Sequence, residues 1–306
     1  MEITFKLLTY IGLLGFILGF VVNKTNFCTM GAISDWVNIG DLSRFKSWMF
    51  AAAIAILGVS LFEYLNFIDA SQSRIPYRSS TLFWPRYILG GLMFGFGMTY
   101  ASGCGNKILI RVGGGNIKSL FVLIVAGLMA YLMTRTDFYG VVFHSWMSPI
   151  SPDLAKLGIE DQSLPIILAF FFSSLNVEIL KLIVGLLIAS IMIFQIFKSG
   201  IFSKNIDNVL SGMTVGTIVV LAWLITGGSL GQEWIEANDF MDTPMPGVGV
   251  QSFTFINPMG ETIIFLGNNA DLYYLTFGVT ALVAVILGSF SYSLISKSFR
   301  VEWFVS

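Results

Sequence analysis

Long runs of apolar side chains constrain this sequence more than any other feature. A bilayer core about 30 Å thick is crossed by roughly 20 helical residues, because each residue of an α-helix adds about 1.5 Å. Windows of that length identify seven predicted membrane spans: Leu7–Val22, Trp48–Ile68, Arg86–Tyr100, Ile117–Thr134, Val177–Phe197, Val209–Thr226 and Tyr273–Ser296. Since lipid offers no partner to a free backbone N–H or C=O group, the runs predict an all-α, polytopic integral membrane protein.

The composition agrees with lipid as the main solvent and excludes several classes of protein. Of the 306 residues, 55% are hydrophobic and only 11% are charged, which excludes a soluble enzyme. A net charge of −1 provides no basic field that would hold nucleic acid. The single histidine and the two cysteines, Cys28 and Cys104, form no CxxC motif and provide no metal site, so no cofactor is expected.

Two apolar segments need separate interpretation. Leu7–Val22 is interpreted as a membrane helix rather than a signal peptide, because Asn23–Met30 offers no small-residue cleavage site. Leu164–Leu175 is only about half as long as a span, so a re-entrant or interfacial helix is predicted there. We expect a single transmembrane domain over residues 1–306, with repeat halves at about 1–68 and 86–134 and a second part at 164–306.

The distribution of Lys and Arg predicts the orientation of the chain, because positive residues are retained on the cytoplasmic side. Gly227–Leu272 contains neither residue type and is expected outside. The flanking basic connections, with Lys198 and Lys204 on one side and Lys297 and Arg300 on the other, are then cytoplasmic. This count leaves three arginines on the outer face, which indicates either an error of one span or a basic mouth that attracts an anion. They are Arg74, Arg78 and Arg86.

An internal repeat contains both cysteines in the same register. The pattern G-x3-G-F-x7-C occurs twice. Its members are Gly15, Gly19, Phe20 and Cys28 in the first copy, and Gly91, Gly95, Phe96 and Cys104 in the second. Small residues four apart on one helix face let another helix approach closely. Beyond them each cysteine is predicted to lie at a break in the helix.

The segments around the cysteines carry the groups that an anion needs. Irregular backbone at membrane depth is tolerated only where protein or a water-filled cavity satisfies its N–H groups, so a cavity is expected at the breaks. Glycines beside Cys104 leave amides exposed as donors, and short helices beginning there add positive dipole ends. The candidate binding residues are Lys24, Asn26 and Cys28 at the first break, and Gly103, Cys104, Gly105, Asn106, Lys107 and Arg111 at the second.

Each of these residues also has a purely structural interpretation. A membrane cysteine is usually a small apolar filler, glycines are usually packing devices, and basic residues usually mark the cytoplasmic side. The shared register of the two cysteines is what favours a functional role. Glu63, inside an apolar span, is interpreted either as a proton site or as a side chain that extends to the membrane interface.

The cysteine segments resemble those of the YeeE/YedE family of sulfur-compound transporters. The resemblance is carried by Asn26–Asp35 with Gly40, Asp41 and Arg44, by Ala101–Asn106 with Arg111 and Gly113–Asn116, and by Trp223–Gly227 and Ser252–Phe255. It covers essentially the whole chain. It implies a multi-pass protein of a bacterial or archaeal inner membrane that takes up thiosulfate or a related sulfur-containing anion. By the same resemblance, Cys28 and Cys104 lie in loops that meet near mid-membrane and pass the substrate along.

The sequence also departs from the family, whose members commonly carry a third cysteine in a further glycine-rich segment. The printed chain contains no third cysteine, so we expect two-thiol transport, a truncated or split member, or a second chain that supplies the segment. A cytosolic sulfur-carrier protein is a further candidate partner. Two small-residue faces are predicted to lie uncovered for want of that segment, one at Gly212 and Gly216 and one at Gly278 and Gly288.

In the favoured mechanism the chain is a transporter and not an enzyme. Loop amides with Lys107 or Arg111 neutralise the oxygens of the anion, while the S–H groups of Cys28 and Cys104 donate weak hydrogen bonds to its sulfur. Two functions of other classes stay open. A membrane thiol oxidoreductase would exchange electrons between paired cysteines and a quinone or haem, and a subunit of a larger sulfur-trafficking complex would transport nothing alone.

Overall fold

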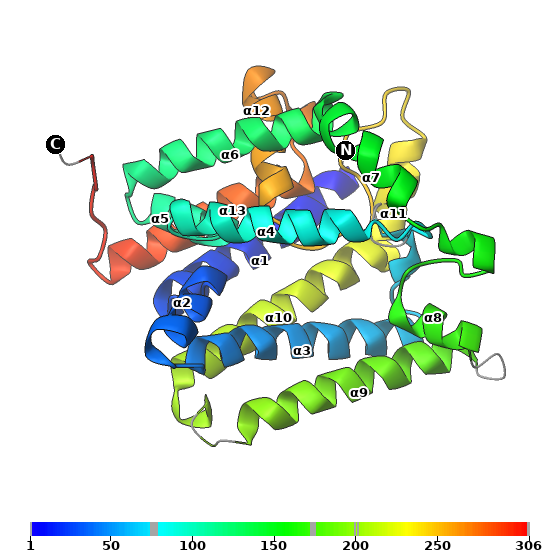
Figure 1. The fold of residues 1–306 in the computed structure, drawn as a ribbon. Helices are drawn as coiled ribbons and strands as arrows, with labels where there is room; N and C mark the ends of the chain where they lie inside the picture. Colours follow the sequence, from blue (N-terminus) through cyan, green and yellow to red (C-terminus); the bar gives the residue numbers. More distant parts are fainter. Residues whose placement is uncertain (1, 74–78, 172–175, 199, 201, 305–306) are drawn as a thin grey trace.

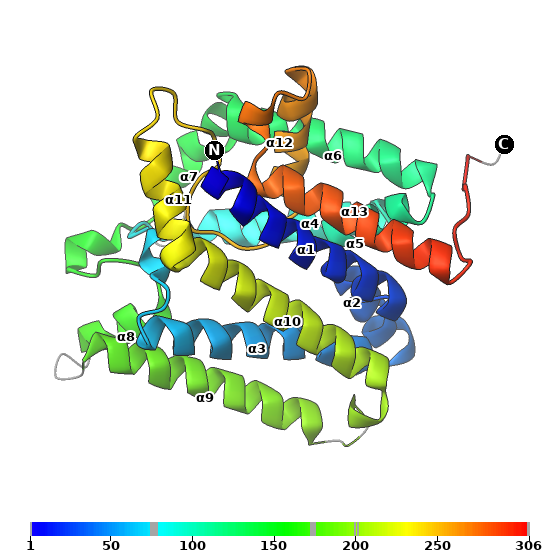
Figure 2. The ribbon, with the colours of Figure 1, turned by 180° about the vertical axis from the view of Figure 1, so that it is seen from behind.

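The computed structural model describes residues 2–73, 79–171, 176–198, 200 and 202–304, and most of these residues are helical (Figures 1 and 2). The longer helices are α1 (Glu2–Thr25), α3 (Ser43–Tyr64), α4 (Trp84–Tyr100), α6 (Ile117–Arg135), α9 (Val177–Phe197), α10 (Ile206–Gly227) and α13 (Phe277–Ile295). The shorter ones are α2 (Thr29–Ile39), α5 (Gly105–Gly113), α7 (Ser145–Met147), α8 (Leu164–Phe171), α11 (Ser229–Asp239) and α12 (Ile256–Gly267). Each predicted span overlaps one of the longer helices.

Six stretches of helix within the described residues are long and apolar enough to cross a membrane. They are Glu2–Ile39, Ser43–Tyr64, Ile117–Arg135, Val177–Phe197, Ile206–Gly227 and Phe277–Ile295. The remaining predicted span lies on α4, which has 17 residues and falls outside this set. The prediction of an all-α, polytopic membrane protein is confirmed, and no β-strand occurs in the part of the chain that the structure describes.

Some sequence predictions concern segments that the structure describes only in part. The predicted re-entrant segment begins as α8, an eight-residue helix, and its positions 172–175 lie outside the described residues. Arg74 and Arg78 also lie outside them. The guanidinium of Arg86 lies 4.5 Å from the ring centroid of Phe83 and 5.2 Å from that of Tyr139, so aromatic faces hold this cation.

Helices α1 and α13 pack backbone against backbone (Figure 2). A Cβ atom at Gly19 would lie 2.0 Å from the carbonyl oxygen of Val285, and one at Gly288 would lie 2.0 Å from that of Phe16. One helical turn before Gly19, a Cβ at Gly15 would meet the Ala284 side chain at 3.0 Å. The glycines of the first repeat copy therefore serve the close approach that their spacing predicts.

The glycines of the second copy have no such neighbour. A Cβ atom at Gly91 or Gly95 would meet nothing within 4 Å in the described chain. Helix α4 lies along the outside of the bundle, and Phe96 and Tyr100 on it are 68% and 88% exposed (Figure 1). Among the described residues, the glycine-bearing face of α4 is therefore uncovered.

The prediction of two uncovered small-residue faces is wrong for both, at Gly212 and Gly216 and at Gly278 and Gly288. Helix α10 packs closely on α3, because Cβ atoms at Gly212 and Gly216 would each lie 2.7 Å from a carbonyl oxygen of α3. A Cβ at Gly278 would lie 2.5 Å from Oε2 of Glu261, and Gly288 meets α1 as described above. Glycine spacing marks a close contact correctly but does not identify the helix that makes it.

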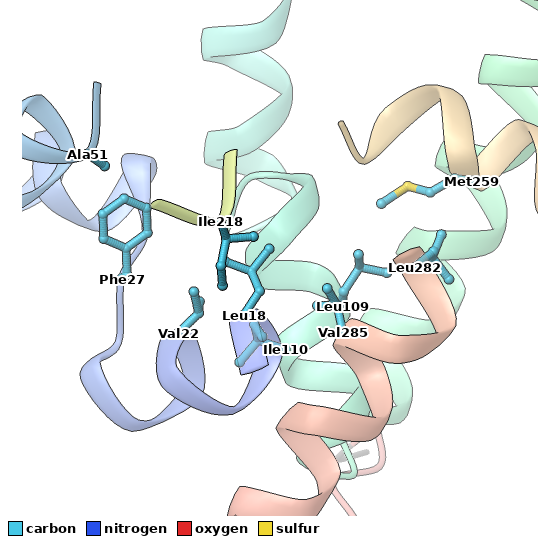
Figure 3. Close-up of a cluster of buried hydrophobic side chains, with 10 residues drawn as sticks. All are labelled: Leu18, Val22, Phe27, Ala51, Leu109, Ile110, Ile218, Met259, Leu282 and Val285. Atoms are coloured by element: carbon cyan, nitrogen blue, oxygen red, sulfur yellow. The ribbon is translucent and has the colours of Figure 1, made fainter. Parts of the chain in front are cut away.

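The main hydrophobic core surrounds the two helix breaks (Figure 3). Its buried members are Leu18, Val22, Phe27, Ala51, Leu109, Ile110, Ile218, Met259, Leu282 and Val285. Phe27 lies in the first break, and the others come from α1, α3, α5, α10, α12 and α13, so helices far apart in sequence meet here. Phe27 is the residue before Cys28, and Leu109 lies five positions after Cys104. The packing that stabilises the bundle therefore also positions the cysteines.

The predicted orientation is tested by labelling a single introduced cysteine. In a cysteine-free variant, S229C should react with an impermeant maleimide in intact cells with a permeabilised outer membrane, because Gly227–Leu272 carries no positive charge. S203C is the matched control from a basic connection, and both serines are exposed. It should react only after lysis; the reverse labelling pattern would invert the topology.

The repeat supplies a matched pair of glycines for a stability test. Gly19→Ala forces apart the backbones of α1 and α13 and should lower the free energy of unfolding by about 2 kcal/mol. Gly95→Ala, at the equivalent position of α4, meets open space and should leave stability unchanged or slightly higher, since alanine favours helix. Thermal unfolding in detergent measures both, and equal losses would contradict the packing argument.

Candidate functional site

Each cysteine lies at a break between two helices and is the N-cap of the second. Cys28 separates α1 from α2, and Cys104 separates α4 from α5. Two residues before each cysteine the backbone is left-handed, with φ of 53° at Asn26 and 55° at Ser102. The repeat therefore extends from the sequence pattern to the backbone conformation. Both short helices start from extended cysteine backbone, so their first amides point towards the thiols.

The two thiols lie side by side. Cys28 and Cys104 are 6% and 9% exposed, and their side chains interact with each other across the two breaks. The amide of Gly31 donates to the sulfur of Cys28 at 3.4 Å. Contacts also cross between the breaks, since the backbone amide of Cys104 faces the sulfur of Cys28 and that of Thr29 faces the sulfur of Cys104. Each sulfur is thus surrounded by backbone donors from both copies of the repeat.

Lys107 brings a positive charge to the thiols. It is half-buried in the first turn of α5, and its ammonium donates to the Asn26 side chain at 2.9 Å. It also interacts electrostatically with Cys28 and with Arg111, which lies one turn further along the same helix. The second break therefore supplies a cation that is anchored on the first break.

A second cation at the site, Arg44, is missing from the residues that the sequence suggested. Its guanidinium covers the start of α2, because a Cβ at Gly31 would lie only 2.6 Å from Nη1. Arg44 interacts electrostatically with Cys28 and forms an ion pair with Asp35. The sequence signal that could have found it is Gly31, which has no side chain, one helical turn before the acidic Asp35, followed by a basic residue after the turn at Gly40.

The remaining predicted site residues fall into two groups. Gly103 and Gly105 are buried around Cys104; a Cβ at Gly103 would lie 3.0 Å from the Lys107 side chain, and one at Gly105 would lie 3.0 Å from Ile256. Lys24 is exposed in the last turn of α1, and no contact in the described chain joins it to the thiols. The structure thus brings the other predicted residues together and leaves Lys24 apart.

Asn106 carries an unsatisfied polar atom beside Cys104. Its Oδ1 is buried and has no hydrogen-bond partner among the described residues. A 180° rotation of the asparagine amide exchanges its oxygen and its nitrogen. In the rotated form the side-chain NH2 group, a hydrogen-bond donor, occupies this buried position. Such a donor in the first turn of α5 suits an anion held next to the thiol.

A polar network fixes the two breaks to α13. The Asn23 side chain donates to both Ser289, at 2.9 Å to its carbonyl oxygen, and Ser293, at 2.9 Å to its hydroxyl. The Ser289 hydroxyl in turn donates to the carbonyl of Ile110 at 2.7 Å. Asn23 lies in the last turns of α1 and Ile110 lies in α5, so one serine of α13 ties together the helices that carry the cysteines.

The glycine run after α5 has a packing role. A Cβ at Gly113 would lie 2.6 Å from the carbonyl of Ile286 in α13. Gly114 and Gly115 accept hydrogen bonds from the amides of Arg300 and Glu302, and Gly115 adopts a φ of 96°. The run therefore lets the segment after α13 lie against the end of α5.

The site as a whole is suited to a small anion with a soft end and a hard end. Amides and dipoles at the N-termini of two helices favour negative charge, and Lys107 and Arg44 add full positive charges. Thiols are weak hydrogen-bond donors that match a soft, polarisable sulfur better than a hard oxygen. The geometry combines both kinds of partner within one buried cluster.

The amino-acid sequence of the chain is similar to those of known proteins. The sequence profile of the family described as "Sulphur transport" matches residues 24–305. The thiosulfate transporter TsuA of Escherichia coli (strain K12) is 22% identical over 306 aligned residues, which cover 94% of this chain and 75% of the relative. The thiosulfate transporter TsuA of Spirochaeta thermophila is 28% identical over 151 residues, covering 49% of this chain and 42% of the relative. With both cysteine breaks inside the matched range, the chain belongs to the Sulphur transport family.

Proposed function

We propose that this chain carries thiosulfate, or a closely related sulfur-containing anion, across the membrane through the two cysteine breaks. The observation that carries the proposal is the pair of interacting, buried thiols at the N-termini of two short helices, with Lys107 and Arg44 near them. The names of both relatives support thiosulfate as the substrate. The six apolar helices support passage through a bilayer.

The mechanism divides the anion between two sets of partners. An unaccompanied dianion is strongly disfavoured in hydrocarbon, so its oxygens need donors and positive charge throughout the passage. Lys107, Arg111 and Arg44 with the helix amides serve the oxygens, and the thiols of Cys28 and Cys104 donate weak hydrogen bonds to the terminal sulfur. Weak contacts let the anion leave as readily as it enters, which conduction requires.

The pairing of the thiols also favours one rival function. Two neighbouring cysteines are what a thiol oxidoreductase needs in order to form a disulfide, with two electrons passing to an acceptor. A transporter needs both thiols reduced as donors, whereas an oxidoreductase cycles between dithiol and disulfide. A redox titration coupled to quinone reduction therefore separates the two functions.

Partners of the chain form a second part of the proposal. We infer that a second chain covers α4 with a transmembrane helix that carries a small residue at the crossing point. The support is the repeat register. Gly15 and Gly19 in α1 face α13, which carries Gly288 at the contact. The equivalent Gly91 and Gly95 in α4 have no neighbour within 4 Å in the described chain. The cytosolic sulfur-carrier protein expected from the resemblance stays a prediction.

Growth of a sulfur-auxotrophic cell that expresses this chain tests the transport function. Thiosulfate as sole sulfur source should support growth, whereas sulfate or a sulfonate should not, because neither presents a soft terminal sulfur. Cys104→Ala should reduce thiosulfate uptake about tenfold or more, as the loss of a hydrogen bond to a charged group costs about 1.5–3 kcal/mol. Cys28→Ala should also impair uptake.

Two further variants make this test specific. Cys104→Ser keeps the size and a donor but replaces the soft sulfur, and it should fall between wild type and Cys104→Ala. Thr99→Ala is the matched control, because the Thr99 hydroxyl bonds only to the backbone of its own helix at Gly95. Normal uptake by a well-expressed Cys104→Ala variant would sink the thiol mechanism.

The covered-α4 proposal is tested by photo-cross-linking in native membranes. A photoreactive phenylalanine analogue at Phe96, which is 68% exposed on α4, should form an adduct with a protein chain, and Gly91→Leu should abolish it. The same analogue at Phe194 of α9, 66% exposed, is the control and should form lipid adducts only. Lipid adducts alone at both positions would count against a second chain.

A further inference from the structure

A buried carboxylate lies outside the thiol site, where α12 meets the start of α13. Glu261 is 5% exposed. Its Oε1 accepts a hydrogen bond from the side-chain amide of Asn257 at 2.9 Å, and its Oε2 accepts one from the hydroxyl of Thr276 at 2.5 Å. Nothing in the thiol mechanism uses this group, although a buried ionisable side chain in a membrane protein calls for an explanation.

Both partners of Glu261 are neutral. The ion pairs of the described residues join Arg44 to Asp35 and Lys181 to both Glu63 and Glu178, and none of them includes Glu261. The contrast with Glu63 is direct, because Glu63 lies 3.2 Å from the ammonium of Lys181. An ion pair thus accounts for the burial of Glu63 in an apolar helix, and it does not account for that of Glu261.

Among the described residues, no charged side chain is paired with Glu261. The elements packed against α12 are α6, α13, η6 (Leu272–Tyr274) and, at Gly105, the start of α5. Their charged or titratable side chains are Lys118, Tyr131 and Arg135 on α6, Tyr292 on α13, Tyr273 and Tyr274 in η6 with Asp271 directly before it, and Lys107 and Arg111 on α5. Within the described part of the chain, none of them hydrogen-bonds or ion-pairs with Glu261, whose two partners are those given above.

The carboxyl group of Glu261 lies at the N-terminus of α13, where its hydrogen-bond partners are neutral. Thr276 is the N-cap of α13 and accepts from the amide of Val279 at 3.2 Å. A Cβ at Gly278 would lie 2.5 Å from Oε2, so the carboxyl group rests directly against the first turn of α13. A buried carboxyl group with neutral partners and no ion pair is a candidate for binding a proton in place of a resident cation.

The helix that carries Glu261 also reaches the thiol site. Its first residue, Ile256, packs against Gly105, where an added Cβ would lie only 3.0 Å from the Ile256 side chain. Gly105 directly follows Cys104. When Oε2 carries a proton, the Thr276 hydroxyl must accept from Glu261 instead of donating to it. Protonation therefore reverses the bond that ties the middle of α12 to α13, five residues from Ile256, through which the helix contacts the second cysteine break.

We propose that Glu261 is a proton-binding site and that a proton bound there accompanies each anion through the thiol site; this inference rests on the proposed transport function. A membrane potential of 100 mV, negative inside, opposes the entry of each negative charge by about 2.3 kcal/mol, and a dianion meets twice that opposition. One proton carried with the dianion offsets one of its two charges. The proton gradient thereby contributes to the driving force for uptake.

The test uses the whole chain reconstituted in liposomes with labelled thiosulfate. With the membrane potential held at zero, an acid-outside gradient of about one pH unit should raise the accumulation ratio about tenfold if one proton moves with each anion. Glu261→Gln keeps the size of the side chain and should lose this response, while it still exchanges labelled for unlabelled thiosulfate at equal pH. Glu236→Gln, exposed on α11, is the matched control and should behave as wild type.

The outcomes distinguish the proton site from the transport function. An equal response to the gradient in wild type and Glu261→Gln overturns the proton site, as does a wild type that exchanges thiosulfate without any response. Should Glu261→Gln fail to fold, Glu261→Asp keeps a titratable carboxyl group and should keep the response; its loss in a folded, exchanging Glu261→Asp overturns the proposal.

An infrared measurement reads the proton site without transport. Titrating the purified protein with acid should produce a protonated-carboxyl band that Glu261→Gln lacks, and identical spectra for the two proteins overturn the proposal. A wild type that exchanges no thiosulfate contradicts the proposed function instead, and the infrared titration then decides on proton binding alone.

Discussion

The backbone contact between α1 and α13 is the constraint on which the site depends. Helices in lipid gain little from hydrophobic burial against one another, so their association relies on close van der Waals packing and on interhelical hydrogen bonds. Gly19 and Gly288 provide the first, because side chains at these positions would collide with backbone. Asn23 provides the second through Ser289 and Ser293. Ser289 also holds α5 at Ile110, so α13 supports both cysteine-bearing breaks at once.

Local features of the site could be predicted from the sequence because they depend on residues that are close together in the chain. The glycines and cysteines in register predict two helix breaks, and both breaks occur, each with a left-handed residue two positions before the cysteine. Arg44 could not be predicted in the same way. It reaches the thiols only because α2 turns back at Gly40, whose φ is 71°, and brings α3 alongside. Lys24 fails for the opposite reason, since α1 continues to Thr25 and leaves this side chain exposed.

The glycine faces show where sequence reasoning about membrane helices stops. Spacing of small residues predicts that some helix approaches, since the steric requirement is local. The identity of that helix is a property of the whole fold, which is why Gly212 and Gly216 proved to face α3 while Gly91 and Gly95 face nothing in the described chain. The two repeat copies share a backbone pattern, but only the glycines of the first copy are packed against another helix of the described chain.

The contacts between the breaks indicate what the recognising unit is. Lys107 of the second break binds Asn26 of the first, and the amides of Cys104 and Thr29 each face the sulfur of the other break. Neither repeat copy has a complete set of donors around its own thiol. An anion held here contacts both copies, so its binding energy depends on their separation, which the α1–α13 contact and the α5–α13 hydrogen bond set. A shift of α1 or α5 against α13 thus changes the separation of the two breaks before any side chain rotates, which makes the packing of α13 part of recognition.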